Sequence, residues 1–141
     1  MSAKKKPVKR RADIPRPYNG GEWTEARMFS FIKSALRGAR WPAKYAAVRT
    51  AYVEDGINPA TGRKCKLHQC GDCRGLFPQN GVQADHIVPV VGPEGFQNWD
   101  AYIKRLFCEA DGFRILCKAC HAEVTAKEQA GRAFEKILFP L

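Results

Sequence analysis

Apolar residues recur at helical spacing in two stretches near the start of the chain. In the first stretch Thr24 is a suitable N-cap, and Gly38 can end the helix. In the second, Pro42 suits the first helical turn, and Gly56 closes the apolar stripe. The pattern therefore predicts a helical hairpin within residues 18–62, with the two apolar stripes as its core.

The second half of the chain combines strand and helix patterns. Residues 82–88 are strand-like up to Pro89, and residues 113–116 predict a second short strand. A helix is expected between them within residues 99–107, and a final helix over residues 120–138. The expected fold class is therefore α+β.

Size and composition set the broad class of the protein. With 141 residues and 45% hydrophobic residues, the chain can form one modest domain with additions. It has no apolar run of about 18 residues, so no membrane span or membrane partner is expected. No apolar stretch follows the basic N-terminus, so we expect no secretory signal and an intracellular location.

The net charge of +10 and the pI near 9.6 indicate an acidic partner. Residues 1–17 form a basic tail that cannot bury a core and is expected to be disordered. One interpretation is a solvated tail; the other, favoured because the rest of the chain is also basic, is an arm that displaces counterions from phosphates. Six positive charges lie within its first eleven residues: Lys4, Lys5, Lys6, Lys9, Arg10 and Arg11.

Two Cys-x-x-Cys pairs predict a structural metal site. Cys70 and Cys73 form one pair and Cys117 and Cys120 the other, with 43 residues between the pairs. Two such turns can complete a tetrahedral shell of four thiolates, for which zinc is the first choice and an iron–sulfur centre the alternative. This shell is closed, so its role is structural. The other two cysteines lack the spacing and are expected to be ordinary thiols: Cys65 and Cys108.

Three polar residues near the cysteine pairs predict a second, catalytic metal site. Asp85 and His86 are adjacent on the expected strand, so their side chains point to opposite faces. His121 follows the last cysteine, and the zinc-bound turn would hold it beside the hairpin. Asp85 and His121 could then share a divalent ion, and His86 could act as general base on water. His68 has no such partner and is expected to be solvated.

The motifs Cys70-x-x-Cys73, Asp85-His86-Ile87-Val88-Pro89 and Leu116-Cys117-x-x-Cys120-His121 closely resemble the HNH endonuclease family in its four-cysteine zinc form. The resemblance covers about residues 65–130. It also extends to the small phage-encoded HNH proteins, for which the location would be the host cytoplasm.

The resemblance implies a ββα-metal (His-Me finger) core within residues 63–141. It also implies His86 as general base, with Asp85 and His121 as ligands of one divalent ion. The implied activity is DNA cleavage that leaves 5′-phosphate and 3′-hydroxyl ends. One position departs from the family: its middle Asn is replaced by Gly112, after Asp111. We expect a backbone carbonyl of this turn, or the Asp111 carboxylate, to orient the histidine or tighten the loop.

The expected function is a metal-dependent DNA endonuclease with structural Zn²⁺ and catalytic Mg²⁺, Mn²⁺ or a similar ion. Arg114 and Lys118 are candidate phosphate contacts, with plain surface charges as the alternative. Double-strand cleavage would call for a homodimer or two sequential nicks, and a role in packaging would call for phage packaging proteins as partners. Homing and defence are the other roles considered. The alternative functions are a non-catalytic zinc-knuckle DNA-binding protein and an RNA-directed nuclease.

Overall fold

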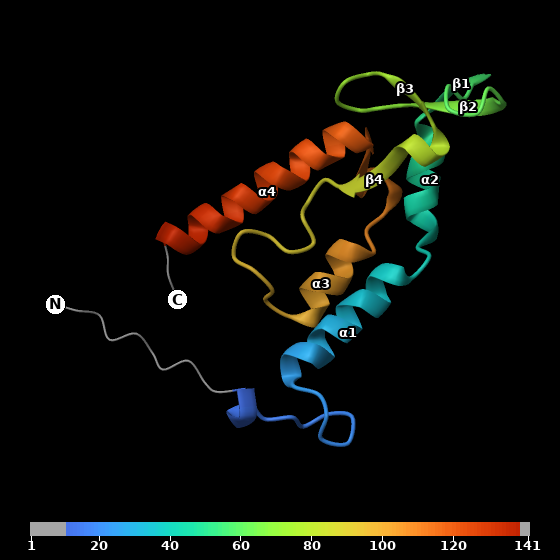
Figure 1. Cartoon of the computed structure of the whole chain (residues 1–141). Helices are drawn as coiled ribbons and strands as arrows, with labels where there is room; N and C mark the ends of the chain where they lie inside the picture. The colour runs from blue at the N-terminus through green and yellow to red at the C-terminus, as the bar shows by residue number, and fades with distance from the viewer. Residues whose placement is uncertain (1–10, 139–141) are drawn as a thin grey trace. The chain divides into compact units, whose positions relative to one another are not determined.

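The structure is a computed structural model that describes residues 11–138, and the side chains of residues 11–131. It is a mixed α+β fold, as the sequence predicts (Figure 1). The chain divides between Arg40 and Trp41 into two compact units. Within the described residues, none of the helices combines the length and apolar character that a membrane crossing requires.

The first unit contains helix α1 (Glu25–Gly38). Thr24 caps it, because its side-chain oxygen accepts a hydrogen bond from the backbone N–H of Arg27 at 3.2 Å. Both the cap and the helix end at Gly38 agree with the sequence prediction. Residues 1–10 of the predicted basic tail lie outside the described residues, and Arg11–Asp13 form a short 3₁₀ turn, η1.

The second unit begins with helix α2 (Pro42–Thr50), with Pro42 in its first turn as predicted. The prediction that this helix continues to Gly56 is wrong. Strand β1 (Tyr52–Ile57) follows it and pairs antiparallel with β2 (Lys64–Gln69). The helix ends because the Ala51 carbonyl accepts a hydrogen bond from the Gln69 N–H at 2.9 Å, which commits the next residues to the sheet. The predicted helical extension over residues 18–62 is therefore helical only in part.

Strands β1, β2 and β3 (Leu76–Pro78) form a three-stranded antiparallel sheet that the sequence analysis missed. The turn between β1 and β2 has a clear local cause. The Asn58 side chain accepts from the Ala60 N–H at 2.9 Å, and Gly62 takes a positive φ of 68°. The Asn58 N–H also donates to the Arg63 carbonyl at 2.9 Å, which leaves four residues, including Gly62, in the turn. A short turn with glycine between two strands is a hairpin signal.

A second antiparallel hairpin joins β4 (Val82–His86) to β5 (Phe113–Cys117), with Asp85 opposite Arg114. The short 3₁₀ turn η2 (Gln79–Gly81) precedes β4. Between the two strands lie helix α3 (Trp99–Leu106) and the turn η3 (Ala110–Gly112). Helix α4 (Lys118–Leu138) follows β5 directly. These elements lie close to where the sequence predicts them, and α4 continues through Gly131.

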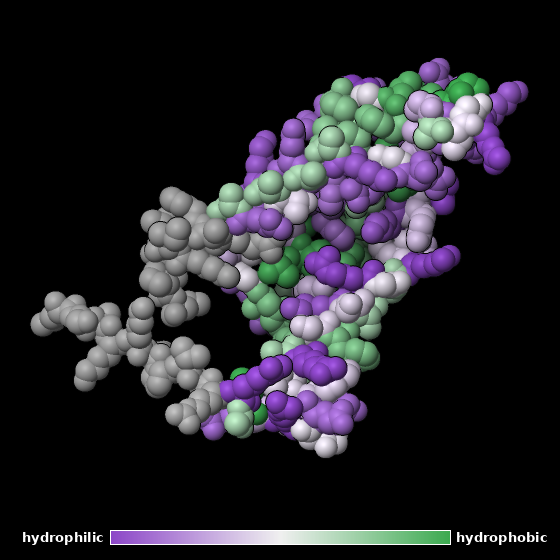
Figure 2. Space-filling model, in the orientation of Figure 1, coloured by the Kyte–Doolittle hydropathy of each residue, from purple (hydrophilic) through white to green (hydrophobic). Residues whose placement is uncertain are grey.

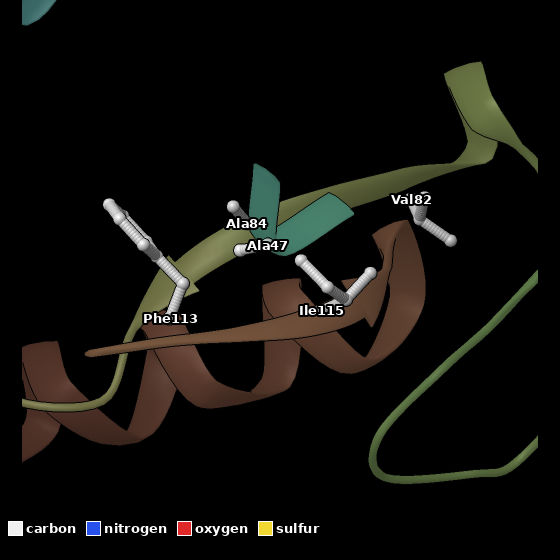
Figure 3. Close-up of a cluster of buried hydrophobic side chains, with 5 residues drawn as sticks. All are labelled: Ala47, Val82, Ala84, Phe113 and Ile115. Atoms are coloured by element: carbon white, nitrogen blue, oxygen red, sulfur yellow. The ribbon is translucent and has the colours of Figure 1, made fainter. Parts of the chain in front are cut away.

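The hairpin β4–β5 separates two packed layers. On one face, Ala47 of α2 packs against alternate residues of the two strands, as Figure 3 shows: Val82, Ala84, Phe113 and Ile115. On the other face, Leu116 belongs to a buried cluster with Cys70, Cys117 and Cys120, against which Val124 of α4 packs. Because strand residues alternate between faces, Asp85 lies on the α4 side and His86 on the opposite side.

Large apolar side chains remain exposed on the three-stranded sheet: Tyr52, Val53, Ile57 and Leu76. Figure 2 shows apolar residues interleaved with hydrophilic ones on the visible face of the molecule. The Lys66 ammonium covers part of this surface, 5.7 Å from the centre of the Tyr52 ring. The main core of the second unit is therefore at β4–β5 rather than at this sheet.

Candidate functional site

The four predicted cysteines come together in one cluster. Their sulfur atoms all lie within 4.8 Å of one another, although the two pairs are far apart in the sequence. The sulfurs of Cys73 and Cys117 are 3.9 Å apart. A tetrahedral zinc ion with Zn–S bonds of about 2.3 Å has sulfur–sulfur edges of about 3.8 Å. The cluster could therefore hold a metal ion such as zinc, with little rearrangement.

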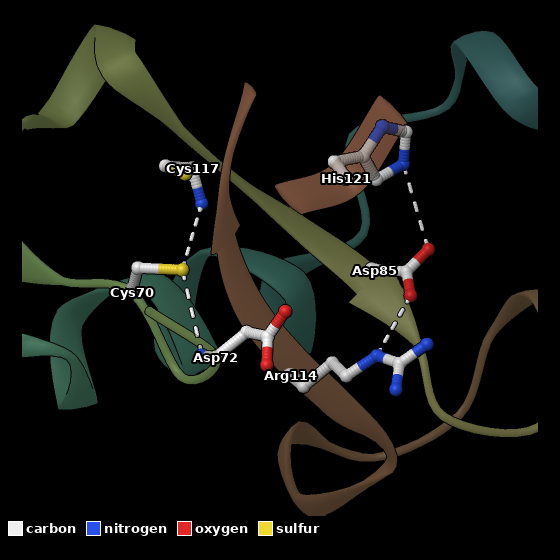
Figure 4. Close-up of polar contacts among 6 residues, drawn as sticks. All are labelled: Cys70, Asp72, Asp85, Arg114, Cys117 and His121. Carbon is white, nitrogen blue, oxygen red and sulfur yellow. Dashed lines mark hydrogen bonds and ion pairs between the residues drawn. The ribbon is translucent and has the colours of Figure 1, made fainter. Parts of the chain in front are cut away.

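Backbone N–H groups stabilise the thiolate form of Cys70, which is the form that binds a metal cation. The sulfur of Cys70 accepts hydrogen bonds from the backbone N–H groups of Asp72 (3.4 Å) and Cys117 (3.3 Å), as Figure 4 shows. Burial opposes ionisation of Cys70, but the hydrogen bonds outweigh it and lower its pKa to about 6. In contrast, a side-chain hydrogen bond with Cys117 raises the pKa of Cys120, and burial raises it further. Four thiolates this close repel one another, so full ionisation requires a cation among them.

Close packing explains the glycines of the first cysteine turn. The Gly71 N–H donates to the Ile115 carbonyl at 2.7 Å, and a Cβ on Gly71 would lie 3.2 Å from that oxygen. A Cβ on Gly75 would lie 2.9 Å from the Phe77 ring. The left-handed residue of this turn is Arg74, with φ of 64°, rather than a glycine. The glycines therefore let β5 and β3 approach the cluster.

Asp85 and His121 lie side by side on the α4 face of the hairpin. Asp85 Oδ1 is 3.5 Å from His121 Nε2, with His121 in the first turns of α4 (Figure 4). Two donors bound at about 2.1 Å to one ion lie about 3.0 Å apart at octahedral angles and about 3.4 Å apart at tetrahedral angles. The spacing and the donor types, one carboxylate oxygen and one imidazole nitrogen, therefore fit two ligands of a single divalent ion.

Arg114 holds the other oxygen of the same carboxylate. Its Nε donates to Asp85 Oδ2 at 2.9 Å, and the two residues are directly opposite each other on β4 and β5. The Asp85 side chain is only 13% exposed, whereas Arg114 is 39% exposed. The carboxylate is therefore oriented from both sides, by a guanidinium and by an imidazole.

His86 is held on the other face of the hairpin. Its Nε2 lies 2.9 Å from the Leu106 carbonyl oxygen, at the end of α3, and its ring packs 4.7 Å from that of Phe113. A carbonyl only accepts hydrogen bonds, so Nε2 carries the proton and Nδ1 of a neutral ring is left to accept one. The geometry thus selects the tautomer in which Nδ1 can act as a base.

The turn at Asp111 and Gly112 was expected either to tighten the hairpin loop or to orient His86, and only the first of these contacts is present. The Gly112 carbonyl accepts from the Ile87 N–H at 3.0 Å, which tightens the end of the hairpin as expected. The expectation that this turn orients His86 is wrong, because the Leu106 carbonyl binds that ring instead. A Cβ on Gly112 would lie 2.7 Å from the sulfur of Cys108, which accounts for glycine at this position.

The prediction that His68 is solvated is also wrong. It lies on β2, only 3% exposed, and its Nδ1 has no hydrogen-bond partner among the described residues. The β2 strand was not predicted, so the burial of alternate residues along it could not be anticipated. Cys65 and Cys108 are partly buried and lie outside the metal-binding group found among the described residues.

The candidate phosphate contacts lie in different environments. Lys4, Lys5, Lys6, Lys9 and Arg10 are outside the described residues, and Arg11 is exposed in η1. Lys118 is exposed at the start of α4. Arg114 is not a plain surface charge, because it forms the ion pair with Asp85.

Comparisons of the chain with protein-family models, curated proteins and solved structures find no match. A functional assignment therefore depends on the residues of this chain and their geometry.

Proposed function

We propose that this protein is a metal-dependent DNA endonuclease of the HNH type. The observation that carries the proposal is the 3.5 Å approach of Asp85 Oδ1 to His121 Nε2. A strand and a helix from distant parts of the chain bring these two donors together, at the positions where the HNH motif requires metal ligands. Strands β4 and β5 and helix α4 also have the order of a ββα-metal core.

His86 is the proposed general base. With Nε2 bound to the Leu106 carbonyl, Nδ1 is the ring atom that can take a proton from an attacking water. The ring cannot turn freely, because it also packs against Phe113. This restraint supports a positioned base rather than a mobile surface histidine.

The proposed reaction is hydrolysis of a phosphodiester. Water attacks the phosphorus as its proton passes to Nδ1 of His86, and the bond from phosphorus to the 3′ oxygen breaks. The products are a 5′-phosphate and a 3′-hydroxyl, which takes up a proton. A divalent ion held by Asp85 and His121 would supply neutralisation of the charge that develops on the phosphate and on the leaving oxygen.

The structural metal has a different proposed role. Cys117 ends β5, and Cys120 and His121 follow it in α4, so a metal bound by the four cysteines would fix the start of α4 against the hairpin. That restraint would hold His121 beside Asp85. The cluster would therefore support the catalytic pair without touching the substrate.

The overall charge supports DNA as the substrate. A net charge of +10 favours phosphate-rich partners, and contacts to the backbone give affinity without reading sequence. The basic tail, Lys118 and the basic residues of the helices are the proposed contacts.

A plasmid-nicking assay with Mg²⁺ or Mn²⁺ tests the proposal. Wild type should nick supercoiled plasmid, and His86→Ala should lose at least about 100-fold in rate while still binding DNA. Asp100→Asn, an acidic residue in the first turn of α3, is the control for surface substitution and should cut at the wild-type rate.

Two results would contradict the proposal. If wild type and His86→Ala bind DNA equally and both leave plasmid intact, the protein is a non-catalytic DNA-binding protein. If wild type cuts an RNA of the same sequence and leaves the DNA intact, the catalytic residues serve an RNA-directed nuclease.

A further inference from the structure

We infer that Arg114 selects the metal ion at the Asp85–His121 pair by occupying one of the two carboxylate oxygens of Asp85. This inference rests on the proposed function, because it assumes that the pair holds a divalent ion. It goes further by assigning a residue that controls which ions fit.

The register of the β4–β5 hairpin places Arg114 in contact with Asp85. Asp85 and Arg114 are opposite each other on neighbouring antiparallel strands, so their side chains emerge on the same face. The Nε–H of Arg114 points at Oδ2 at 2.9 Å, and the acceptor carboxylate is mostly buried. Partial burial weakens competition from water, which keeps Oδ2 paired.

The two oxygens of Asp85 consequently have different partners. Oδ2 is paired with Arg114, whereas Oδ1 is directed to His121 Nε2 at 3.5 Å (Figure 4). An ion at the pair can therefore take one oxygen from this carboxylate. Binding through both oxygens would require the Arg114 contact to break.

This arrangement discriminates between classes of divalent ion. Mg²⁺ and ions of similar size bind carboxylates through one oxygen, in compact octahedral shells that keep several waters. Ca²⁺ takes more oxygen ligands and often uses both oxygens of a carboxylate. Arg114 should therefore disfavour Ca²⁺ relative to Mn²⁺ or Mg²⁺, because it covers Oδ2.

Metal binding by the zinc-loaded full chain, rather than activity, gives the test. Mn²⁺ binding is measured by electron paramagnetic resonance of the free ion, and Ca²⁺ affinity by its competition with Mn²⁺. Arg114→Met removes the donor and the charge but keeps the chain length, and Arg114→Lys keeps a cationic donor. Lys127→Met removes one exposed charge from α4 and is the matched control.

The ratio of Ca²⁺ to Mn²⁺ affinity is the decisive quantity. Arg114→Met should raise the ratio about tenfold, because Ca²⁺ gains a second carboxylate oxygen. Arg114→Lys should stay within about twofold of wild type in this ratio, because its ammonium group remains a donor for Oδ2. Lys127→Met should do the same, because loss of a charge alone affects both divalent ions alike. If circular dichroism shows that Arg114→Met does not fold, Arg114→Ala provides the same comparison.

The outcomes separate this inference from the proposed function. Equal ratios in Arg114→Met and Lys127→Met, with Mn²⁺ binding that Asp85→Asn abolishes, would overturn the role of Arg114 and leave the proposed metal site at Asp85 and His121 standing. Absence of Mn²⁺ binding by zinc-loaded wild type would overturn both the inference and the proposed catalytic metal site.

Discussion

At the residue scale, the Cys108 side chain occupies the space that a side chain at position 112 would need. A Cβ on Gly112 would lie 2.7 Å from the Cys108 sulfur and 3.1 Å from its Cβ. The resemblance places an asparagine at this position, and the structure shows why this chain does not carry one. The backbone of Gly112 still closes the hairpin through Ile87, so the turn is retained without the side chain.

This crowding predicts the cost of introducing the asparagine that the resemblance places at position 112. Gly112→Asn should lower the free energy of unfolding by about 1–3 kcal/mol, because the added atoms overpack the site. The double variant Cys108→Ala, Gly112→Asn should recover part of that loss. Chemical denaturation measures both variants.

Gly131 provides a control of opposite sign. It lies in α4 with nothing within 4 Å of an added Cβ. Gly131→Ala should stabilise the helix by up to about 1 kcal/mol through helix propensity. A loss of stability in Gly131→Ala as large as in Gly112→Asn would contradict the crowding explanation.

At the element scale, α2 depends on the β4–β5 hairpin for its packing. Ala47 is 2% exposed and lies against residues of both strands. The Trp41 indole N–H also donates to the Cys108 carbonyl, which links the start of α2 to the segment after α3. A small residue at position 47 therefore sets how closely the helix approaches the layer that carries His86.

Substitution of Ala47 by a larger residue should separate these layers. Ala47→Leu is expected to cost about 1–3 kcal/mol of unfolding free energy, because the enclosed site cannot accept three more carbons without shifts. Ala126→Leu, at an exposed position of α4, should change stability by less than about 0.5 kcal/mol. Equal losses in the two variants would contradict the packing described for α2.

At the scale of the whole molecule, two of the four clustered cysteines lie on the same hairpin and helix as the Asp85–His121 pair. Cys117, Cys120 and His121 are within five residues at the junction of β5 and α4. A metal at the cluster would connect the first cysteine turn to this junction. We therefore expect a metal at the cysteine cluster to be needed for folding and a metal at the Asp85–His121 pair to be needed for catalysis.

Metal removal should separate the two requirements. Mild EDTA treatment is expected to stop plasmid cleavage while far-UV circular dichroism stays that of the folded protein, because a site with two protein ligands holds its ion weakly. Readdition of Mg²⁺ or Mn²⁺ should restore cleavage. Unfolding at the same EDTA concentration that stops cleavage would contradict two separable sites.

Loss of a cluster ligand should have the opposite effect. Cys117→Ser should lose zinc and unfold the second unit, since metal binding in a small domain contributes directly to folding. Cys65→Ser is the matched control, because Cys65 lies outside the cluster, and it should retain zinc and fold. A Cys117→Ser protein that folds and cuts normally would exclude a structural role for the cluster.

The sequence by itself determined the features that depend on neighbouring residues. The Thr24 cap, the start of α2 at Pro42 and the paired cysteine turns follow from interactions within a few residues. Strand β1 escaped prediction because its helical-looking stripe is overridden by pairing with β2.

Only the tertiary structure decided the partners of the candidate site residues. The Leu106 carbonyl at His86 and the Arg114 guanidinium at Asp85 come from segments that no local pattern connects to them. Hydrogen bonds and ion pairs depend on distances of about 3 Å. Those distances are set by how the hairpin, α3 and α4 pack together, so they exist only once the chain has folded.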